Sequence, residues 1–300
     1  MQLSKLFNTT NPNMKYIWFM FLPILVVVAI QYGVIMVDVV ILFIKNVLSN
    51  QEVDRDATIE FIMNSDYKQP MNIAYMTLVQ YLIYILVFGI WYYKAFCKDS
   101  DLFAIDDIKS CGAYGKEKLI NKNTIRLIIG GFAAQLFVDG ILTLIEPYFQ
   151  STFDKYGKMV DSLTGVGSSW VLLIAVVVIA PIGEELLFRG LIQSYGLKNF
   201  APVLAIFLQG LIFGLYHGNI IQGIYAFLMG MVLGLVAHKL NSIIPSMVLH
   251  ISVNGSLFLV PQALYQGTVK TVITTILSGL MFASMIYLVV RKEKEDIIEN

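Results

Sequence analysis

Charged side chains are scarce in this 300-residue chain, and their scarcity excludes an ordinary soluble domain. Only 14% of the residues are Asp, Glu, Lys or Arg, whereas 57% are hydrophobic. A soluble domain carries about a quarter charged residues. The composition therefore indicates that a lipid bilayer is the solvent for most of the chain.

Cysteine is almost missing, and no charge of one sign is in excess. The two cysteines, Cys97 and Cys111, have no close metal or redox spacing. Lysines plus arginines number 21 and equal the aspartates plus glutamates. Because no basic excess or basic block exists, we expect the lipid bilayer, and no nucleic acid, among the partners.

Long apolar runs predict membrane-spanning helices, each of which needs about 20 mostly apolar residues. Eight segments qualify, or seven if the third is peripheral: 16–44, 72–93, 125–146, 169–195, 201–217, 220–238, 243–260 and 269–290. The first exceeds the apolar core of a signal peptide and is followed by no small-residue cleavage site, so we expect it to be retained. The sequence thus predicts an all-α fold, a polytopic membrane helical bundle of about eight transmembrane helices.

The distribution of lysine and arginine predicts the orientation of this bundle, because cytoplasmic segments carry an excess of both. With the N-terminus inside, 15 of the 21 lie in cytoplasmic segments. The other six are Lys45, Arg55, Lys68, Lys155, Lys158 and Lys270. We therefore expect a multi-pass protein of the cell membrane with both termini cytoplasmic.

The organisation of the chain changes near residue 165. Residues 1–164 hold three hydrophobic helices with long loops, whereas residues 165–300 hold five closely spaced helices with very short turns. Two pairs of glycines in the second half are four residues apart: Gly210 with Gly214 and Gly230 with Gly234. This GxxxG spacing lets helix backbones approach closely. We expect the second half to be one tightly packed bundle with a C-terminal helix.

Ionisable side chains inside the predicted fourth helix are the first sign of chemistry. Each such side chain raises the free energy of inserting the helix into the membrane by about 2.5–3.5 kcal/mol. A residue of this kind is therefore usually kept for a function. Glu185 and Arg189 are four residues apart and can pair on one helix face. Glu184 is rotated by about 100° from its neighbour and has no partner in its own helix. The pattern predicts one paired carboxylate beside one reactive carboxylate.

Two of the three histidines fall near the depth of Glu184. His217 ends the predicted fifth helix, and His250 lies in the seventh, four residues before Asn254 on the same face. At about 1.5 Å per residue from the cytoplasmic helix ends, Glu184, His217 and His250 lie roughly 18, 24 and 14 Å deep. We expect these groups to share a pocket inside the membrane on its cytoplasmic side, with Glu184 within about 10 Å of a histidine.

A carboxylate, two imidazoles and an amide suit hydrolysis of an amide bond. A carboxylate can take a proton from water, and an imidazole can position that water or protonate the leaving group. Amide and imidazole N–H groups can stabilise the developing oxyanion. The set could also hold a divalent metal such as Zn²⁺, with Glu184, His217 and His250 as candidate ligands. The HExxH signature of soluble zinc proteases is absent, and the spacings leave the cofactor open.

Three motifs occur in order on separate hydrophobic helices. They are Glu184-Glu185-x-x-x-Arg189, Phe213-x-x-x-His217 and His250-x-x-x-Asn254. Together they resemble the CPBP family, also called Abi, which includes type II CAAX prenyl endopeptidases and bacterial proteins linked to bacteriocin processing or self-immunity. The resemblance covers about residues 165–260.

The resemblance implies an intramembrane (metallo)endopeptidase that uses a glutamate-activated water. Its substrate would be a membrane-associated or prenylated-type peptide, or a membrane protein, that enters from the cytoplasmic leaflet. Glu184 would activate the water and His217 would help to position it, while His250 and Asn254 would form the oxyanion hole. Three residues would support the site: Glu185, Arg189 and Phe213. The catalytic part is then the second half of the chain.

Two other classes of protein stay open. A proton-coupled transporter could use buried acids as a relay, but such folds usually show internal repeats and broken helices in both halves. Here the polar residues cluster in one half. A non-catalytic membrane protein that confers immunity or acts as a scaffold could keep the same fold. The sequence identifies neither the substrate nor the oligomeric state.

Overall fold

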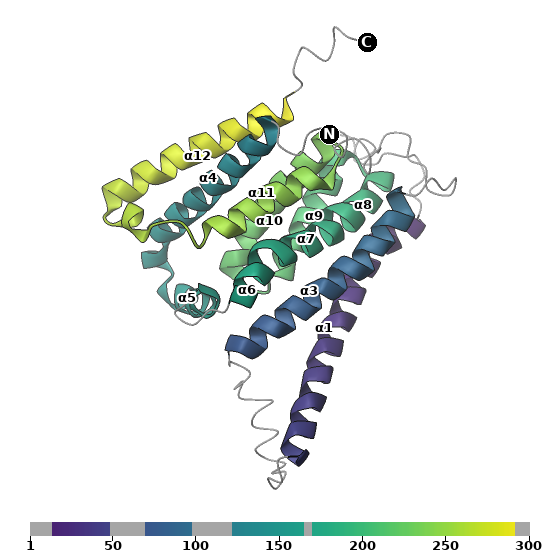
Figure 1. Cartoon of the computed structure of the whole chain (residues 1–300). Helices are drawn as coiled ribbons and strands as arrows, with labels where there is room; N and C mark the ends of the chain where they lie inside the picture. Colours follow the sequence, from purple (N-terminus) through teal and green to yellow (C-terminus); the bar gives the residue numbers. More distant parts are fainter. Residues whose placement is uncertain (1–13, 49–69, 98–121, 165–169, 292–300) are drawn as a thin grey trace.

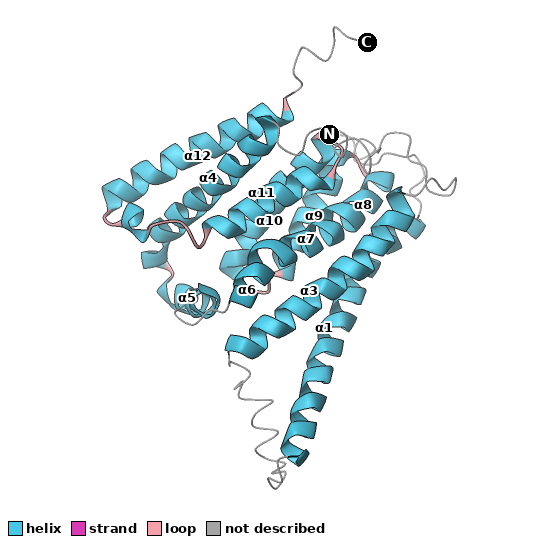
Figure 2. Cartoon of the chain, viewed as in Figure 1, coloured by secondary structure: helices cyan, strands magenta, loops and turns pink. Residues whose placement is uncertain are grey.

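The computed structural model describes residues 14–48, 70–97, 122–164 and 170–291, which are almost entirely helical (Figure 2). Five long helices are α1 (Met14–Leu48), α3 (Pro70–Tyr92), α4 (Lys122–Ile145), α10 (Ile220–Lys239) and α12 (Thr268–Val290). A sixth runs continuously through α6 (Trp170–Ile174), η5 (Ala175–Ile179), α7 (Ala180–Glu185), η6 (Leu186–Gln193) and α8 (Ser194–Asn199). Shorter helices are α5 (Gln150–Thr164), α9 (Pro202–Tyr216) and α11 (Ile243–Ser256). The all-α prediction is confirmed for this part of the chain.

Six of the described helices are long and apolar enough to cross a membrane, which confirms a polytopic membrane bundle. The predicted fifth and seventh spans correspond to α9 and α11, which have only 15 and 14 residues. At 1.5 Å per residue they reach about 20 Å, whereas the hydrocarbon core is about 30 Å thick. The predicted number of eight full spans is therefore not confirmed.

The start of α1 and the end of α12 lie at the same end of the bundle, and α5 lies at the opposite end (Figure 1). We call these the terminal end and the α5 end. Short connections join α8 to α9 and α10 to α11 at the terminal end. Both short helices therefore begin at the terminal end and stop before they reach the α5 end.

The glycine pairs act as the sequence predicts. A Cβ on Gly214 would lie 2.6 Å from the carbonyl oxygen of Gly223, and one on Gly230 would lie 3.1 Å from the Cα of Gly210. Because those distances leave no room for a side chain, the glycines allow α9 and α10 to pack backbone to backbone. This packing brings the end of α9, with His217, into the centre of the bundle.

The helices of the first half pack directly on those of the second half. α4 lies against α11 and α12, while α3 lies against α6, α7 and η6. A boundary near residue 165 remains a prediction from the sequence. The contacts mean that α3 and α4 supply walls of any site built in the second half.

Candidate active site

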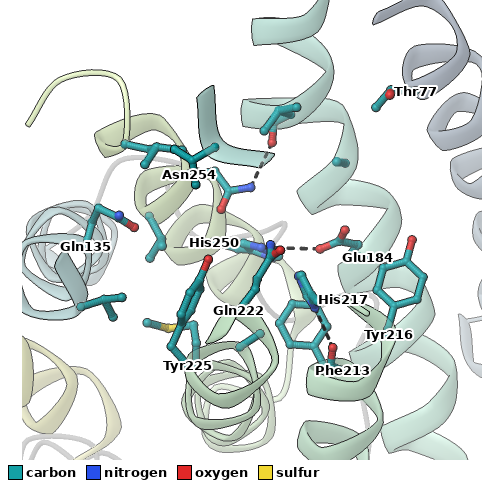
Figure 3. Close-up of a pocket in the computed structure, with 18 of the residues that line it drawn as sticks. Thr77, Gln135, Glu184, Phe213, Tyr216, His217, Gln222, Tyr225, His250 and Asn254 are labelled. Atoms are coloured by element: carbon teal, nitrogen blue, oxygen red, sulfur yellow. Dashed lines mark hydrogen bonds and ion pairs between the residues drawn. The ribbon is translucent and has the colours of Figure 1, made fainter. Parts of the chain in front are cut away.

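A cavity of about 400 Å³ is lined by residues of α1, α3, α4, α5, η5, α7, α9, α10 and α11. Five of the residues singled out in the sequence line it (Figure 3): Glu184, Phe213, His217, His250 and Asn254. The other two, Glu185 and Arg189, are fully buried in the adjoining helix packing. The structure thus brings together side chains from three separate helices, as the spacing of the motifs predicts.

Glu184 and His250 face each other across this cavity. Oε2 of Glu184 lies 3.7 Å from Nε2 of His250, well inside the expected 10 Å. Each side chain is only 7% exposed, so water surrounds neither of them freely. The separation is too long for a direct hydrogen bond, which leaves both atoms able to bind a third group.

Glu185 holds His250 in a defined orientation. Its Oε1 accepts hydrogen bonds from Nη1 of Arg189 at 2.7 Å and from Nδ1 of His250 at 2.9 Å. The pairing of Glu185 with Arg189 in the next helical turn is the one that the sequence predicts. Because Nδ1 of His250 is the donor to this carboxylate, Nε2 is the ring nitrogen directed at Glu184.

His217 has its tautomer defined by a backbone group. Its Nδ1 lies 2.7 Å from the carbonyl oxygen of Phe213, which can only accept a hydrogen bond. The proton of the neutral ring is therefore on Nδ1, and Nε2 carries a free lone pair. The ring of Phe213 also packs edge-on against both histidines, with ring centroids 4.7 Å and 5.7 Å apart. Phe213 thus orients the two imidazoles through its carbonyl and its ring.

Asn254 compensates for an irregular turn in the helix that carries Glu184. In η5 the N–H of Ala180 bonds to the carbonyl of Ala175, a wide π-type turn. The corresponding partner of the Val176 carbonyl would be Pro181, which has no N–H. Nδ2 of Asn254 donates to that carbonyl at 3.0 Å. One of the two amide hydrogens of Asn254 is thereby used, and the second is left for the cavity.

Tyr81 of α3 is a site residue that the motifs did not reveal. Its hydroxyl donates to Oε1 of Glu184 at 2.7 Å and lies 3.3 Å from the hydroxyl of Tyr216. A local signal does exist in the sequence, because four polar residues of this apolar helix share one face. They follow the helical spacing three, four and seven: Thr77, Gln80, Tyr81 and Tyr84.

The candidate metal ligands do not form a metal site in the described part of the chain. No group of three His, Cys, Asp or Glu side chains there is close enough to hold one ion. Glu184 and His250 are neighbours, but Oε1 of Glu184 is taken by Tyr81 and Nδ1 of His250 by Glu185. The arrangement therefore does not fit the metal ion that the resemblance to a (metallo)endopeptidase implies.

The cavity reaches toward one end of the bundle, and the structure does not test which side of the membrane that end faces. The cavity is lined by Tyr156 and Val160 of α5 and by residues close to the end of α9 and of α11. It therefore extends toward the α5 end of the bundle, away from the terminal end. The depths of roughly 18 and 24 Å expected for Glu184 and His217 already exceed half of a core about 30 Å thick. The expected position of the site on the cytoplasmic side of the membrane stays a prediction.

The comparison with protein families agrees with this geometry. Residues 166–256 match a family model described as Type II CAAX prenyl endopeptidase Rce1-like. The matched segment contains all three motifs and ends two residues after Asn254. Neither a curated protein nor a solved structure matches the chain. Residues 166–256 are thus an Rce1-like domain of the type II CAAX prenyl endopeptidase kind, which supports an intramembrane protease of the CAAX type.

Proposed function

We propose that this chain is an intramembrane endopeptidase in which Glu184 activates the water that attacks a peptide bond. The observation that carries the proposal is the approach of Oε2 of Glu184 to Nε2 of His250 within a cavity large enough for a peptide segment. Oε1 of Glu184 accepts a hydrogen bond from the hydroxyl of Tyr81, which fixes the orientation of the carboxylate. Oε2 is therefore the atom that can accept a proton from water.

The first chemical step is the addition of water to the scissile carbonyl. Oε2 of Glu184 removes one proton while the water oxygen bonds to the carbonyl carbon, giving a tetrahedral intermediate. The free lone pair on Nε2 of His217 accepts a hydrogen bond that positions the same water. Carboxylate and imidazole thus act together on a single nucleophile.

The second step is collapse of the intermediate. The C–N bond breaks as the proton held by Glu184 passes to the leaving nitrogen. The water has then supplied the OH group of a new carboxyl and one hydrogen of a new amine. The oxyanion receives hydrogen bonds from the second N–H of Asn254 and from Nε2–H of His250. Because Nδ1 of His250 already donates to Glu185, this role requires His250 to be an imidazolium, with both ring nitrogens protonated, before water attacks. Arg189 and Glu185 hold His250 in place and do not touch the substrate.

The wider setting follows from the family and the charge distribution. We propose that both termini are cytoplasmic and that the substrate is a membrane-associated peptide, with bacteriocin processing or self-immunity as the process served. A proton-coupled transporter would need a polar route to both faces, whereas apolar packing closes the terminal side of this site. A non-catalytic immunity protein would have no need of an oriented Glu184.

A comparison of membrane peptides tests the proposal directly. Peptides are profiled from cells that produce the wild-type chain and from cells that produce Glu184→Gln at the same level in the membrane. We expect cleavage products, with their uncut precursors depleted, only in the wild-type cells. Identical peptide profiles, or products that persist with Glu184→Gln, would contradict hydrolysis by this site.

Tyr81 gives a second test, since it acts on the reaction only through Glu184. Tyr81→Phe removes the donor at 2.7 Å while it keeps the ring in place. A hydrogen bond to a charged group contributes about 1.5–3 kcal/mol, so we expect kcat to fall by tenfold or more. KM should change little, because the hydroxyl does not bind substrate.

The matched control for this substitution is Tyr75→Phe, on the same helix, where the side chain is 50% exposed. It should leave kcat at the wild-type value. Equal kcat for Tyr81→Phe and wild type, or a change confined to KM, would show that Tyr81 does not position the carboxylate.

A further inference from the structure

We infer that Tyr216 is a positioning residue for the reaction and that it acts through Tyr81 on the carboxylate of Glu184. It belongs to a chain of hydrogen bonds that ends at Oε1 of Glu184. The members of this tyrosine chain, in order, are Gln80, Tyr84, Tyr216 and Tyr81. The inference deepens the proposed function and rests on it for the role of Glu184 as the base, whereas the chain itself rests on geometry.

The tyrosine chain runs from α3 to the end of α9 and back to α3. Nε2 of Gln80 donates to the hydroxyl of Tyr84 at 3.0 Å. A side-chain hydrogen bond links Tyr84 to Tyr216. The hydroxyl of Tyr216 lies 3.3 Å from that of Tyr81, which donates to Oε1 of Glu184 at 2.7 Å. Two polar residues of α3 that the catalytic motifs do not include, Gln80 and Tyr84, are thereby connected to the site.

The number of available protons defines the direction of every hydrogen bond in the chain. A tyrosine hydroxyl has one proton to donate, and its oxygen can also accept. The proton of Tyr81 goes to the carboxylate of Glu184, which as an anion can only accept. Tyr216 must then be the donor to Tyr81, and Tyr84 the donor to Tyr216. The amide N–H of Gln80 completes the order, so all the donors point toward the carboxylate.

A chain with a single direction strengthens the hydrogen bond at its end. Each added bond polarises the next one and strengthens it by about 10–30%. Glu184 is only 7% exposed, and among the described residues Tyr81 is its one hydrogen-bond donor. The aligned dipoles of the chain therefore stand in for the water that this carboxylate lacks. Because Tyr216 fixes the hydroxyl of Tyr81, the carboxylate keeps one rotation, with Oε2 directed into the cavity.

Two simpler roles for Tyr216 make different predictions. Its ring packs edge-on against Phe188 and His217, with ring centroids 5.4 Å and 5.7 Å away, so it could act by packing alone. It also lines the cavity, so its hydroxyl could bind substrate directly. Tyr216→Phe keeps the ring, and a packing role would therefore be unaffected. A direct contact with substrate would be lost whether or not the hydroxyl of Tyr81 is present.

The first measurement is kcat and KM for Tyr216→Phe, alone and combined with Tyr81→Phe, on the peptide found in the cellular comparison. A neutral hydrogen bond is worth about two- to tenfold in a rate, so we expect kcat to fall by that factor with KM unchanged. In the Tyr81→Phe protein the second substitution should have no further effect, since both groups act through one contact. Equal factors in both backgrounds, an unchanged kcat, or a change in KM alone would overturn the inference.

The matched control is Tyr195→Phe, which also removes a buried hydroxyl. Tyr195 is 2% exposed and accepts a hydrogen bond from Nε1 of Trp91 at 3.0 Å. It lies on the same continuous helix as Glu184, but in the described ranges no hydrogen bond joins it to the tyrosine chain. We expect its kcat to equal that of the wild type. A fall as large as that of Tyr216→Phe would show that loss of any buried hydroxyl slows the reaction, and would overturn the specific role of the chain.

Infrared spectroscopy tests the chain without any cleavage. The carboxylate stretching bands of Glu184 are those that disappear in Glu184→Gln, and their frequencies depend on the hydrogen bonds to the two oxygens. We expect Tyr216→Phe to shift these bands in the same direction as Tyr81→Phe and by a smaller amount, while Tyr195→Phe leaves them in place. Bands of Tyr216→Phe at the wild-type frequencies would overturn the inference even if the wild-type protein cleaves its substrate. Shifted bands in a protein that cleaves no peptide would support the chain and contradict the proposed function.

Discussion

Glu184→Gln is expected to lower the rate of peptide cleavage by roughly 10²–10⁴-fold, the usual contribution of a positioned general base. Glutamine has nearly the size of glutamate, and its amide oxygen can still accept the hydrogen bond of Tyr81. The change therefore removes the proton acceptor at Oε2 while it preserves the packing of the site. Substrate affinity should stay close to that of the wild type, because the carboxylate acts on the water.

The measurement is kcat and KM on the purified protein in detergent or bilayers, with the peptide found in the cellular comparison. Glu146→Gln, at an exposed position beside α4, is the matched control and should cleave at the wild-type rate. Activity of Glu184→Gln within a few-fold of the wild type would exclude Glu184 as the base. Size-exclusion chromatography and far-UV circular dichroism should show that Glu184→Gln is as well folded as the wild type, so that a loss of activity reports on the missing base.

The sequence predicts those features of the site that depend on helical periodicity. The four-residue spacing of Glu185 and Arg189 indicates their contact, and the structure shows it at 2.7 Å. The same spacing places His250 and Asn254 on one face, and both line the cavity. Glycine pairs indicate that α9 and α10 pack closely. These features are local, because the number of residues between two positions on one helix decides whether they share a face.

What the sequence did not predict depends on contacts between distant segments or on irregular backbone. Tyr81 lies 103 residues before Glu184, in a half of the chain without a motif. The π-type turns on either side of α7 have one visible cause, Pro181, but the carbonyl that is freed could not be assigned to Asn254 without coordinates. The depth of His217 and of Asn254 in the bundle depends on where α9 and α11 end, and apolar composition alone does not define those ends.

Arg189 makes a buried network whose loss should destabilise the whole bundle. Its Nη1 donates to Glu185, and its Nη2 donates to the carbonyl of Gly230 on α10 at 3.2 Å. The guanidinium also lies 4.6 Å from the ring centroid of Phe213. One side chain thus connects the helix of Glu184 with α9 and α10. A Glu185 carboxylate left without this partner would be an uncompensated charge in an apolar interior.

Arg189→Met is therefore expected to lower the free energy of unfolding by about 3–5 kcal/mol, the cost of breaking a buried ion pair from one side. Unfolding is followed by the loss of helical circular dichroism as SDS is added to the protein in mixed micelles. Arg291→Met, at an exposed position, should leave the transition unchanged. The double variant Glu185→Gln/Arg189→Met should recover part of the loss, because it removes the unpaired carboxylate as well. A double variant no more stable than Arg189→Met would show that the hydrogen bond to Gly230 and the packing on Phe213, and not the ion pair, hold these helices together.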